Sequence, residues 1–412
     1  MSAWSSEATE ASYEAAFRLA PRSAEADEAF QRFAAAGLPS RRVESWHYTD
    51  LRRALGSPAP FAPQPDTQRI AQAKAMLGER LGTTRLVLVD GRFAPELSDE
   101  PPEGATLRGG APTLALAKRE DAMLAFAGAF AQGGFSLEVQ DGADIGRIEI
   151  VHVLRPGVSS ASHVRFYFLP EARGTVVERT LGAASGSQRH RLASFELSVG
   201  AKVEHAVVIE DAASVELESL RVEQYEKASF SSFALVAGPA LTRRQIFARL
   251  DGKDASLALS GLSLIDGTRA ADTTLEVTHA AAHGVSREFY RHIVADEATG
   301  VFQGKVIVDQ HSQKTDGGMK SQALLLSPTA QMNNKPELEI FADDVVCGHG
   351  ATVGALDPNQ IFYLEARGIP QKEAEAMLLE AFGVEAIDRV EDTAIAELLR
   401  ERLAAWLKGR AA

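Results

Sequence analysis

The middle of this 412-residue chain consists of short strand-like runs with no long helix between them. Apolar and polar residues alternate within many of these runs, and Gly, Asp or Ser closes each one. Examples are Ile148–Val153, Val164–Phe168, Ser194–Gly200, Val203–Ile209, Ser256–Ile265, Val301–Val308 and Glu337–Phe341. Such a series permits a sandwich, a barrel or a solenoid. A β-solenoid is favoured, because strand-plus-turn units recur without the hairpins of a meander.

Helical patterns flank the strand-rich region on both sides. Before it, helices are expected at Ala24–Ala36 and Leu114–Phe130, with a short strand at Arg85–Val89. After it, Asp357 is expected to cap a helix that begins at Pro358. The chain is therefore expected to be mainly β, with a helical N-terminal domain at residues 1–145, a β-solenoid core at 146–356 and a helical C-terminal domain at 357–412.

Two further helices are expected within the C-terminal region. One spans Pro370–Phe382 and should stop at Gly383, and the other spans Thr393–Lys408. The last helix carries an apolar stripe made of Ile395, Leu398, Leu399, Leu403, Trp406 and Leu407. That stripe can either pack against the end of the solenoid or dock into a groove of a partner protein.

Composition excludes several classes of function. Lys and Arg number 43 against 56 Asp and Glu, and the resulting net charge of −13 argues against a nucleic-acid-binding protein. The single cysteine excludes an intramolecular disulfide and fits a reducing cytoplasm. The first residues lack a basic region followed by an apolar run, and no apolar stretch is long enough for a membrane span, so neither secretion nor membrane insertion is expected.

The single cysteine, Cys347, lies two residues before His349 in the glycine-rich segment Phe341–Gly354. Residues two apart on a strand point to the same face, so sulfur and imidazole can aim at one point. Gly348 and Gly350 leave room for another chain to approach. The pair suits metal binding, yet a lone cysteine is more often a small buried residue. Two ligands also cannot complete a tetrahedral site, so any metal here needs ligands from elsewhere.

The remaining candidate groups are weaker. His279 and His283 are four apart, which on a helix would allow both to bind one metal, but a structural role in a turn is at least as well favoured. His311 lies in a polar, turn-like stretch and is expected to be solvated. The chain contains no phosphate-loop motif and no Gly-x-Ser-x-Gly elbow. We therefore expect no nucleotide to be bound by this chain itself.

The segment from Thr278 to Gly368 resembles the SufB/SufD family of iron–sulfur cluster assembly proteins. The resemblance rests on an ordered series of motifs: His279–His283, Ser286-Arg287, Gly300–Val308, Gln313–Asp316, Leu324–Ser327, Lys335–Ile340, Phe341–Gly354, Phe362–Leu364 and Arg367–Ile369. Near the N-terminus, Gly37–Pro39 and Glu44–Leu51 are similar to the SufD branch, as are the chain length and the scarcity of cysteine. The chain departs from the usual pattern at Gly348, where serine is frequent, and at Glu365, where a basic residue is frequent.

The resemblance implies a right-handed parallel β-helix and a non-catalytic scaffold subunit. It implies pairing with SufB through the β-helix and binding of the ATPase SufC, which would hydrolyse the ATP, through the C-terminal helices. It also implies iron acquisition and a transient iron–sulfur cluster at the SufB–SufD interface, with His349 and Cys347 as the contributing residues. The isolated chain could form a homodimer.

Two other classes stay open on the residues alone. One is an extracellular-type β-helix enzyme that acts on polysaccharides, and the other is a simple metal-binding protein. Metal stoichiometry of the isolated chain, compared with its mixture with SufB and SufC, would distinguish a metal-binding protein from a scaffold.

Overall fold

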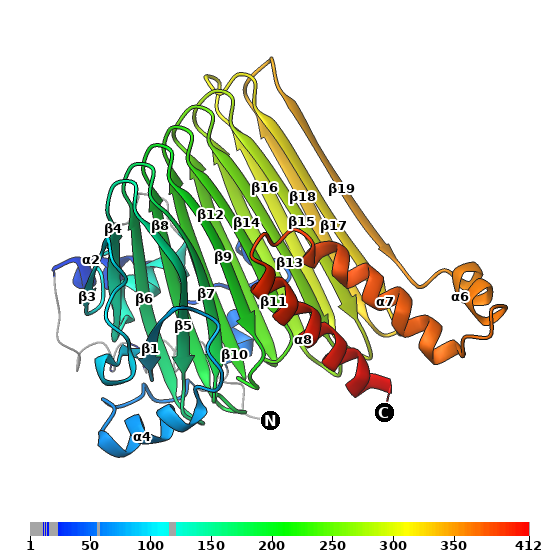
Figure 1. Cartoon of the computed structure of the whole chain (residues 1–412), viewed down its shortest axis with the longest axis horizontal. Helices are drawn as coiled ribbons and strands as arrows, with labels where there is room; N and C mark the ends of the chain where they lie inside the picture. Colours follow the sequence, from blue (N-terminus) through cyan, green and yellow to red (C-terminus); the bar gives the residue numbers. More distant parts are fainter. Residues whose placement is uncertain are drawn as a thin grey trace.

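The computed structural model describes residues 11, 13, 15, 24–55, 58–114 and 121–411, and two long sheets dominate it (Figure 1). Successive strands alternate between the two sheets, so each pair of strands adds one turn to a solenoid. Neighbours within a sheet are parallel, apart from the antiparallel pairs β1–β2 and β3–β4. The expected mainly β chain with a parallel β-helix core is confirmed.

The strands lie in the following order along the two sheets. The ten-stranded sheet contains β19 (Val346–Gly354), β17 (Asp316–Leu325), β15 (Val285–Val294), β13 (Ser256–Ile265), β11 (Ser229–Val236), β9 (Lys202–Ile209), β7 (Arg173–Leu181), β5 (Asp144–Val153), β1 (Thr84–Val89) and β2 (Arg92–Phe93). The nine-stranded sheet contains β18 (Gln331–Ile340), β16 (Thr299–Val308), β14 (Ala270–His279), β12 (Leu241–Leu250), β10 (Val215–Gln224), β8 (Gln188–Leu197), β6 (Ser159–Phe168), β4 (Gly133–Val139) and β3 (Ala105–Gly109).

Both sheets begin before residue 146. The expected strand at Arg85–Val89 is present as β1, and it pairs with β5, while β4 pairs with β6. The N-terminal region therefore contributes strands to the solenoid as well as helices.

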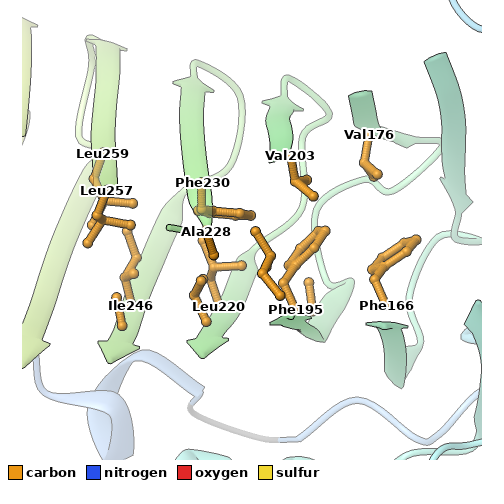
Figure 2. Close-up of a cluster of buried hydrophobic side chains, with 14 of the residues drawn as sticks. Phe166, Val176, Phe195, Val203, Leu220, Ala228, Phe230, Ile246, Leu257 and Leu259 are labelled. Atoms are coloured by element: carbon orange, nitrogen blue, oxygen red, sulfur yellow. The ribbon is translucent and has the colours of Figure 1, made fainter. Parts of the chain in front are cut away.

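The interior of the solenoid is built from stacked columns of apolar side chains (Figure 2). Val203, Phe230 and Leu257 lie in register on neighbouring strands of one sheet. From the other sheet, Phe195 reaches Phe230, with ring centres 5.1 Å apart. Because side chains alternate between faces along each strand, every turn adds the same kind of layer to this core.

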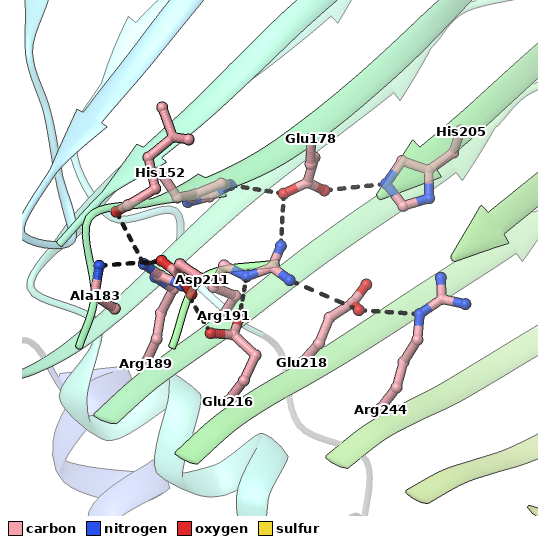
Figure 3. Close-up of polar contacts among 11 residues, drawn as sticks. His152, Glu178, Ala183, Arg189, Arg191, His205, Asp211, Glu216, Glu218 and Arg244 are labelled. Atoms are coloured by element: carbon pink, nitrogen blue, oxygen red, sulfur yellow. Dashed lines mark hydrogen bonds and ion pairs between the residues drawn. The ribbon is translucent and has the colours of Figure 1, made fainter. Parts of the chain in front are cut away.

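Charged side chains also line part of the interior (Figure 3). Glu178 accepts hydrogen bonds from His152 Nε2 at 2.7 Å, from His205 Nε2 at 3.1 Å and from Arg191 Nη1 at 3.0 Å. Arg191 Nε donates to Glu216 at 2.7 Å. These side chains are at most 5% exposed. Burying this many charges is tolerated only because each charge meets an opposite one.

The same network extends along the nine-stranded sheet on both sides of Arg191. Arg189 Nη1 donates to Glu216 at 2.9 Å, and Arg244 Nε donates to Glu218 at 3.0 Å. Arg191 Nη2 lies 3.7 Å from Glu218. Arg191 therefore connects three carboxylates that approach it from two sheets.

The described N-terminal helices are α2 (Ala24–Ala36), α3 (Leu51–Leu55), α4 (Thr67–Met76) and α5 (Ala122–Phe130), with 3₁₀ turns η1 (Glu44–Trp46) and η2 (Pro95–Leu97). The expected helix at Ala24–Ala36 is confirmed. The helix expected at Leu114–Phe130 is present only as α5, because Leu114 is not helical and α5 begins at Ala122, while residues 115–120 lie outside the described residues. Trp46 anchors this region: its Nε1 donates to Asp121 at 3.0 Å, and the Arg243 guanidinium lies 4.2 Å from the centre of its ring. The Glu44–Leu51 motif therefore packs against the nine-stranded sheet.

The C-terminal helices are α6 (Pro358–Glu365), α7 (Gln371–Ile387) and α8 (Thr393–Ala411). The Asp357 side chain accepts a hydrogen bond from the backbone of Asn359, as expected for an N-cap. The expectation that Gly383 stops the second helix is wrong, because α7 continues to Ile387. A Cβ at Gly383 would lie 2.7 Å from Leu403 Cδ2, so the glycine allows α8 to pack closely.

Helices α7 and α8 lie across the outer face of the ten-stranded sheet, and α6 lies beyond β19 (Figure 1). Leu399 and Leu403 of the α8 stripe are fully buried against sheet residues such as Leu262. The packing alternative for this stripe is therefore confirmed and the partner-docking alternative is wrong. The stripe covers a face of the sheet rather than the end of the solenoid.

Across the described part of the chain, no helix is both long and apolar enough to cross a membrane.

Candidate site at the open end of the solenoid

The last turn of the solenoid leaves two strands without an outer neighbour. β18 and β19 are the terminal strands of their sheets. Exposed apolar residues gather on these strands and on the loop between them, namely Ile340, Phe341, Val346 and Val353. An unpaired strand edge offers backbone N–H and C=O groups to another chain. This end of the molecule is therefore suited to pairing with a second protein.

Cys347 and His349 lie on the inward face of β19. His349 is in register with Met319 of β17, which is buried in the interior core, and Cys347 packs against that same core. The expectation that the two side chains share one face is confirmed. Because no strand follows β19, this inward face opens at the end of the solenoid instead of being covered by another turn.

Cys347 is half-buried, and the residue opposite it on the neighbouring strand has no side chain. Its register partner on β17 is Gly317, and a Cβ there would lie 3.4 Å from Cys347 Sγ and 3.7 Å from Ser286 Oγ. Burial raises the pKa of the Cys347 thiol above its ordinary value, and the charges of Asp316 and Glu288 raise it further. The thiol therefore stays protonated near neutral pH, whereas the thiolate is the form of cysteine that binds metals.

Glu288 was not identified as a candidate from the sequence. It lies on β15, in register with Met319, and is 1% exposed. Neither carboxylate oxygen has a hydrogen-bond partner among the described residues, and burial raises the pKa of this group to about 7. The sequence signal was present, since Ser286, Glu288, Tyr290 and His292 alternate at period two along β15. Three of these four inward residues are polar and only Tyr290 packs in the apolar core, whereas the inward positions of a core strand are usually apolar.

His349 is exposed, and its surroundings are open. Cβ atoms added at Gly348 and Gly350 would meet nothing within 4 Å, so the serine that the resemblance leads us to expect at position 348 would fit. Among the residues that the structure places, no group of three or more His, Cys, Asp or Glu is arranged to hold a metal ion. Cys347 and His349 are thus two donor-type side chains on a face that is open at the end of the solenoid.

The other histidine candidates are separated by the fold. His279 ends β14 and is fully buried, while His283 lies in the following turn with a φ of 63°. The pair is not on a helix, so the interpretation as an i, i+4 metal pair is wrong. Burial lowers the pKa of His279 to about 4, which keeps it neutral. His311 is exposed in a turn, as expected.

Helix α6 is the most exposed apolar part of the C-terminal region. Phe362 is 71% exposed and Tyr363 is 58% exposed, and α6 contains no buried residue. Glu365, the position that departs from the family pattern, ends this helix and is exposed. The outer surface of α6, unlike the α8 stripe, is thus free to contact another protein.

Comparisons with known proteins agree with this architecture. Residues 154–382 match the family described as "SUF system FeS cluster assembly, SufBD core domain". The chain is 31% identical over 408 residues to the iron–sulfur cluster assembly protein SufD of Escherichia coli, covering 95% of this chain and 94% of that protein. It is 24% identical over 392 residues to a SufBD family protein of Synechocystis, covering 88% and 86% of the two chains.

A shorter match joins the chain to SufD of Bacillus subtilis, with 34% identity over 119 residues, or 28% of this chain and 26% of that protein. The family match spans most of the solenoid together with α6 and most of α7. The chain therefore belongs to the SufB/SufD family of iron–sulfur cluster assembly proteins, and its full-length likeness is to SufD.

Proposed function

We propose that this chain is a scaffold subunit that pairs with SufB at the open end of its solenoid and helps to hold a nascent iron–sulfur cluster there. The observation that carries the proposal is the position of Cys347 and His349 on the inward face of β19, the last strand of its sheet. Two ligand-type side chains with an open side suit a cluster whose other ligands come from the partner.

The two residues take different roles in this proposal. The exposed imidazole of His349 binds iron or receives a proton directly. Cys347 supports the site, because its half-buried thiol is protonated until the partner or the iron arrives. The cluster is a cargo that is assembled and passed on, and this chain supplies part of its binding surface.

The proposal assigns ATP hydrolysis to SufC and gives this chain no catalytic step of its own. SufC is proposed to dock on the C-terminal region, through the exposed aromatic side chains of α6. Cluster assembly by this chain is proposed to take place in the cytoplasm, where the reducing environment keeps a lone thiol reduced. Family membership supports cluster assembly over polysaccharide cleavage or simple metal storage.

His349→Ala is expected to lower cluster assembly on the complex with SufB and SufC at least about tenfold, since even residues that only support a metal ligand cost that much. The complex itself should still form, because His349 is exposed and no fold contact depends on it. Cluster formation is followed by visible absorption, and complex formation by size-exclusion chromatography. Cys347→Ala should have a milder effect.

His311→Ala is the matched control, because it removes another exposed histidine, which lies in the turn before β17 and not on the terminal strand β19. Its assembly rate should equal that of the unaltered chain. Full assembly by His349→Ala would refute the proposed role of the imidazole, whatever the behaviour of Cys347→Ala.

Phe362→Ser is expected to weaken the binding of SufC about tenfold or more, as is usual when an aromatic anchor of an interface is truncated. Isothermal titration of SufC into the purified chain measures this directly. Met377→Ser on α7 removes another exposed apolar side chain, 44% exposed, and should leave affinity unchanged. Unaltered affinity of Phe362→Ser would exclude this face of α6 as the docking site.

A further inference from the structure

Three cations surround the ring of Phe289 on the outer face of the ten-stranded sheet. The guanidinium carbons of Arg389 and Arg291 lie 4.5 Å and 5.1 Å from the ring centre, and Lys320 Nζ lies 5.8 Å from it. The residues come from β15, β17 and the segment that follows α7. They form one compact group because β15 and β17 pair with Phe289 opposite Lys320.

The positive charge of this group is only partly balanced. Glu385 pairs with Arg291, and it is the one carboxylate that forms an ion pair with any of the three cations among the described residues. The adjacent acid, Asp388, pairs instead with Arg400. Among the described residues, only one of the three cations therefore has a carboxylate partner, on a chain whose overall net charge is −13.

Arg291 is the buried member, at 5% exposed, and its Nε has no hydrogen-bond partner. Its register partner Gln322 likewise has an unpartnered Oε1, and the amide of that residue can also donate through Nε2. Burial lowers the pKa of Arg291, Glu385 raises it, and the charge of Arg389 lowers it again. A buried donor without a partner beside a like charge is costly, and an anion would relieve both costs.

The group is accessible from solvent. Lys320 and Arg389 are exposed. On the β19 side, the register partner of Lys320 is Gly350, and a side chain there would meet nothing within 4 Å. No side chain of the terminal strand covers the lysine, so a small molecule can reach it.

We propose that Arg291, Lys320 and Arg389 form a binding site for a phosphate-type oxyanion, such as the phosphate monoester of a small molecule. The guanidinium group of arginine can donate two parallel hydrogen bonds to two phosphate oxygens, and the ammonium group of lysine adds a compact positive charge. Arg291 also lies 4.1 Å from the centre of the Phe382 ring, so stacking between two rings accounts for its position. Stacking gives no reason for Lys320 and Arg389 to join it on the Phe289 ring. The site lies on the face of the sheet opposite Cys347 and His349, so it is independent of the proposed cluster site.

The test is the binding of inorganic phosphate to the full chain, measured by isothermal titration at constant ionic strength, with AMP as the organic phosphate and sodium chloride as the reference. Phosphate and AMP should bind with one site per chain and compete with each other. Arg389→Gln and Lys320→Gln should each weaken binding about tenfold, the usual cost of losing one charge-assisted contact. Both residues are exposed, so these variants are expected to fold.

Arg249→Gln removes the same charge from an exposed ion pair with Asp251 on the nine-stranded sheet, and it should bind phosphate as tightly as the unaltered chain. Arg389→Lys keeps the charge but loses the bidentate hydrogen bonds of the guanidinium group. Its affinity for phosphate should fall between that of the unaltered chain and that of Arg389→Gln. Absence of phosphate binding at millimolar concentration, or equal binding by Arg389→Gln, Lys320→Gln and Arg249→Gln, would overturn the assignment.

Discussion

Replacing Arg191 with methionine is expected to lower the free energy of unfolding by about 3–5 kcal/mol. The guanidinium bonds Glu178 and Glu216 and lies 3.7 Å from Glu218, all inside the solenoid. Methionine fills much of the space but leaves three buried carboxylates with one cation fewer. Urea unfolding followed by circular dichroism measures the change. The urea concentration at the unfolding midpoint should fall, while the β-sheet spectrum of the variant without urea should stay unaltered.

Arg165→Met provides the matched control. Arg165 pairs with Glu196 on the outside of the solenoid, where the two side chains are 27% and 32% exposed. Such an exposed pair contributes at most about 1 kcal/mol. If Arg191→Met cost no more than Arg165→Met, the interior network would not be held together by this arginine.

Truncation after Gly354 is expected to produce a chain that binds apolar dyes and self-associates. The deletion removes α7 and α8 and uncovers Phe233, Leu235 and Leu262 on the outer face of the ten-stranded sheet. Each large side chain exposed in this way costs about 1.5–3 kcal/mol. Dye fluorescence and size-exclusion chromatography report the exposed face, and thermal unfolding should begin at a lower temperature.

The result decides how the docking of SufC can be tested. If truncation disturbs the fold, loss of SufC binding by the truncated chain says nothing about α6, and the Phe362→Ser variant is the informative one. That variant should keep the unaltered unfolding midpoint, because Phe362 is 71% exposed. A monodisperse truncated chain with an unaltered midpoint would mean that the two helices contribute little to the stability of the solenoid.

Much of the fold could be predicted from local pattern. Period-two alternation located runs such as Ser256–Ile265 and Val203–Ile209, which are β13 and β9. The same period placed Cys347 and His349 on one face, because the pleat of a strand fixes that relation without any knowledge of its neighbours. Asp357 before Pro358 located the start of α6 for an equally local reason, the capping of free backbone N–H groups.

Features that depend on residues far apart in the sequence were either predicted wrongly or not predicted at all. Gly383 was expected to end a helix, yet it lies inside α7 because Leu403, twenty residues later, packs against it. Charges at alternate positions, such as Arg189 with Arg191 and Glu216 with Glu218, suggested no network until β8 and β10 paired in register. Their partners in the opposite sheet, such as Glu178, are brought close only by the winding of the chain.

Local alternation along the sequence predicts strands such as β9 and β13, the side of each strand on which their residues lie, and the common face of Cys347 and His349. The winding of the complete chain makes their strand the last one of its sheet, buries the apolar stripe of α8, and brings Arg291, Lys320 and Arg389 together around Phe289. The two kinds of feature differ in the sequence distance between the residues that produce them. Backbone geometry sets a period within a few residues, whereas the end of a solenoid and the cover of a sheet face depend on which surfaces the complete winding leaves unpaired.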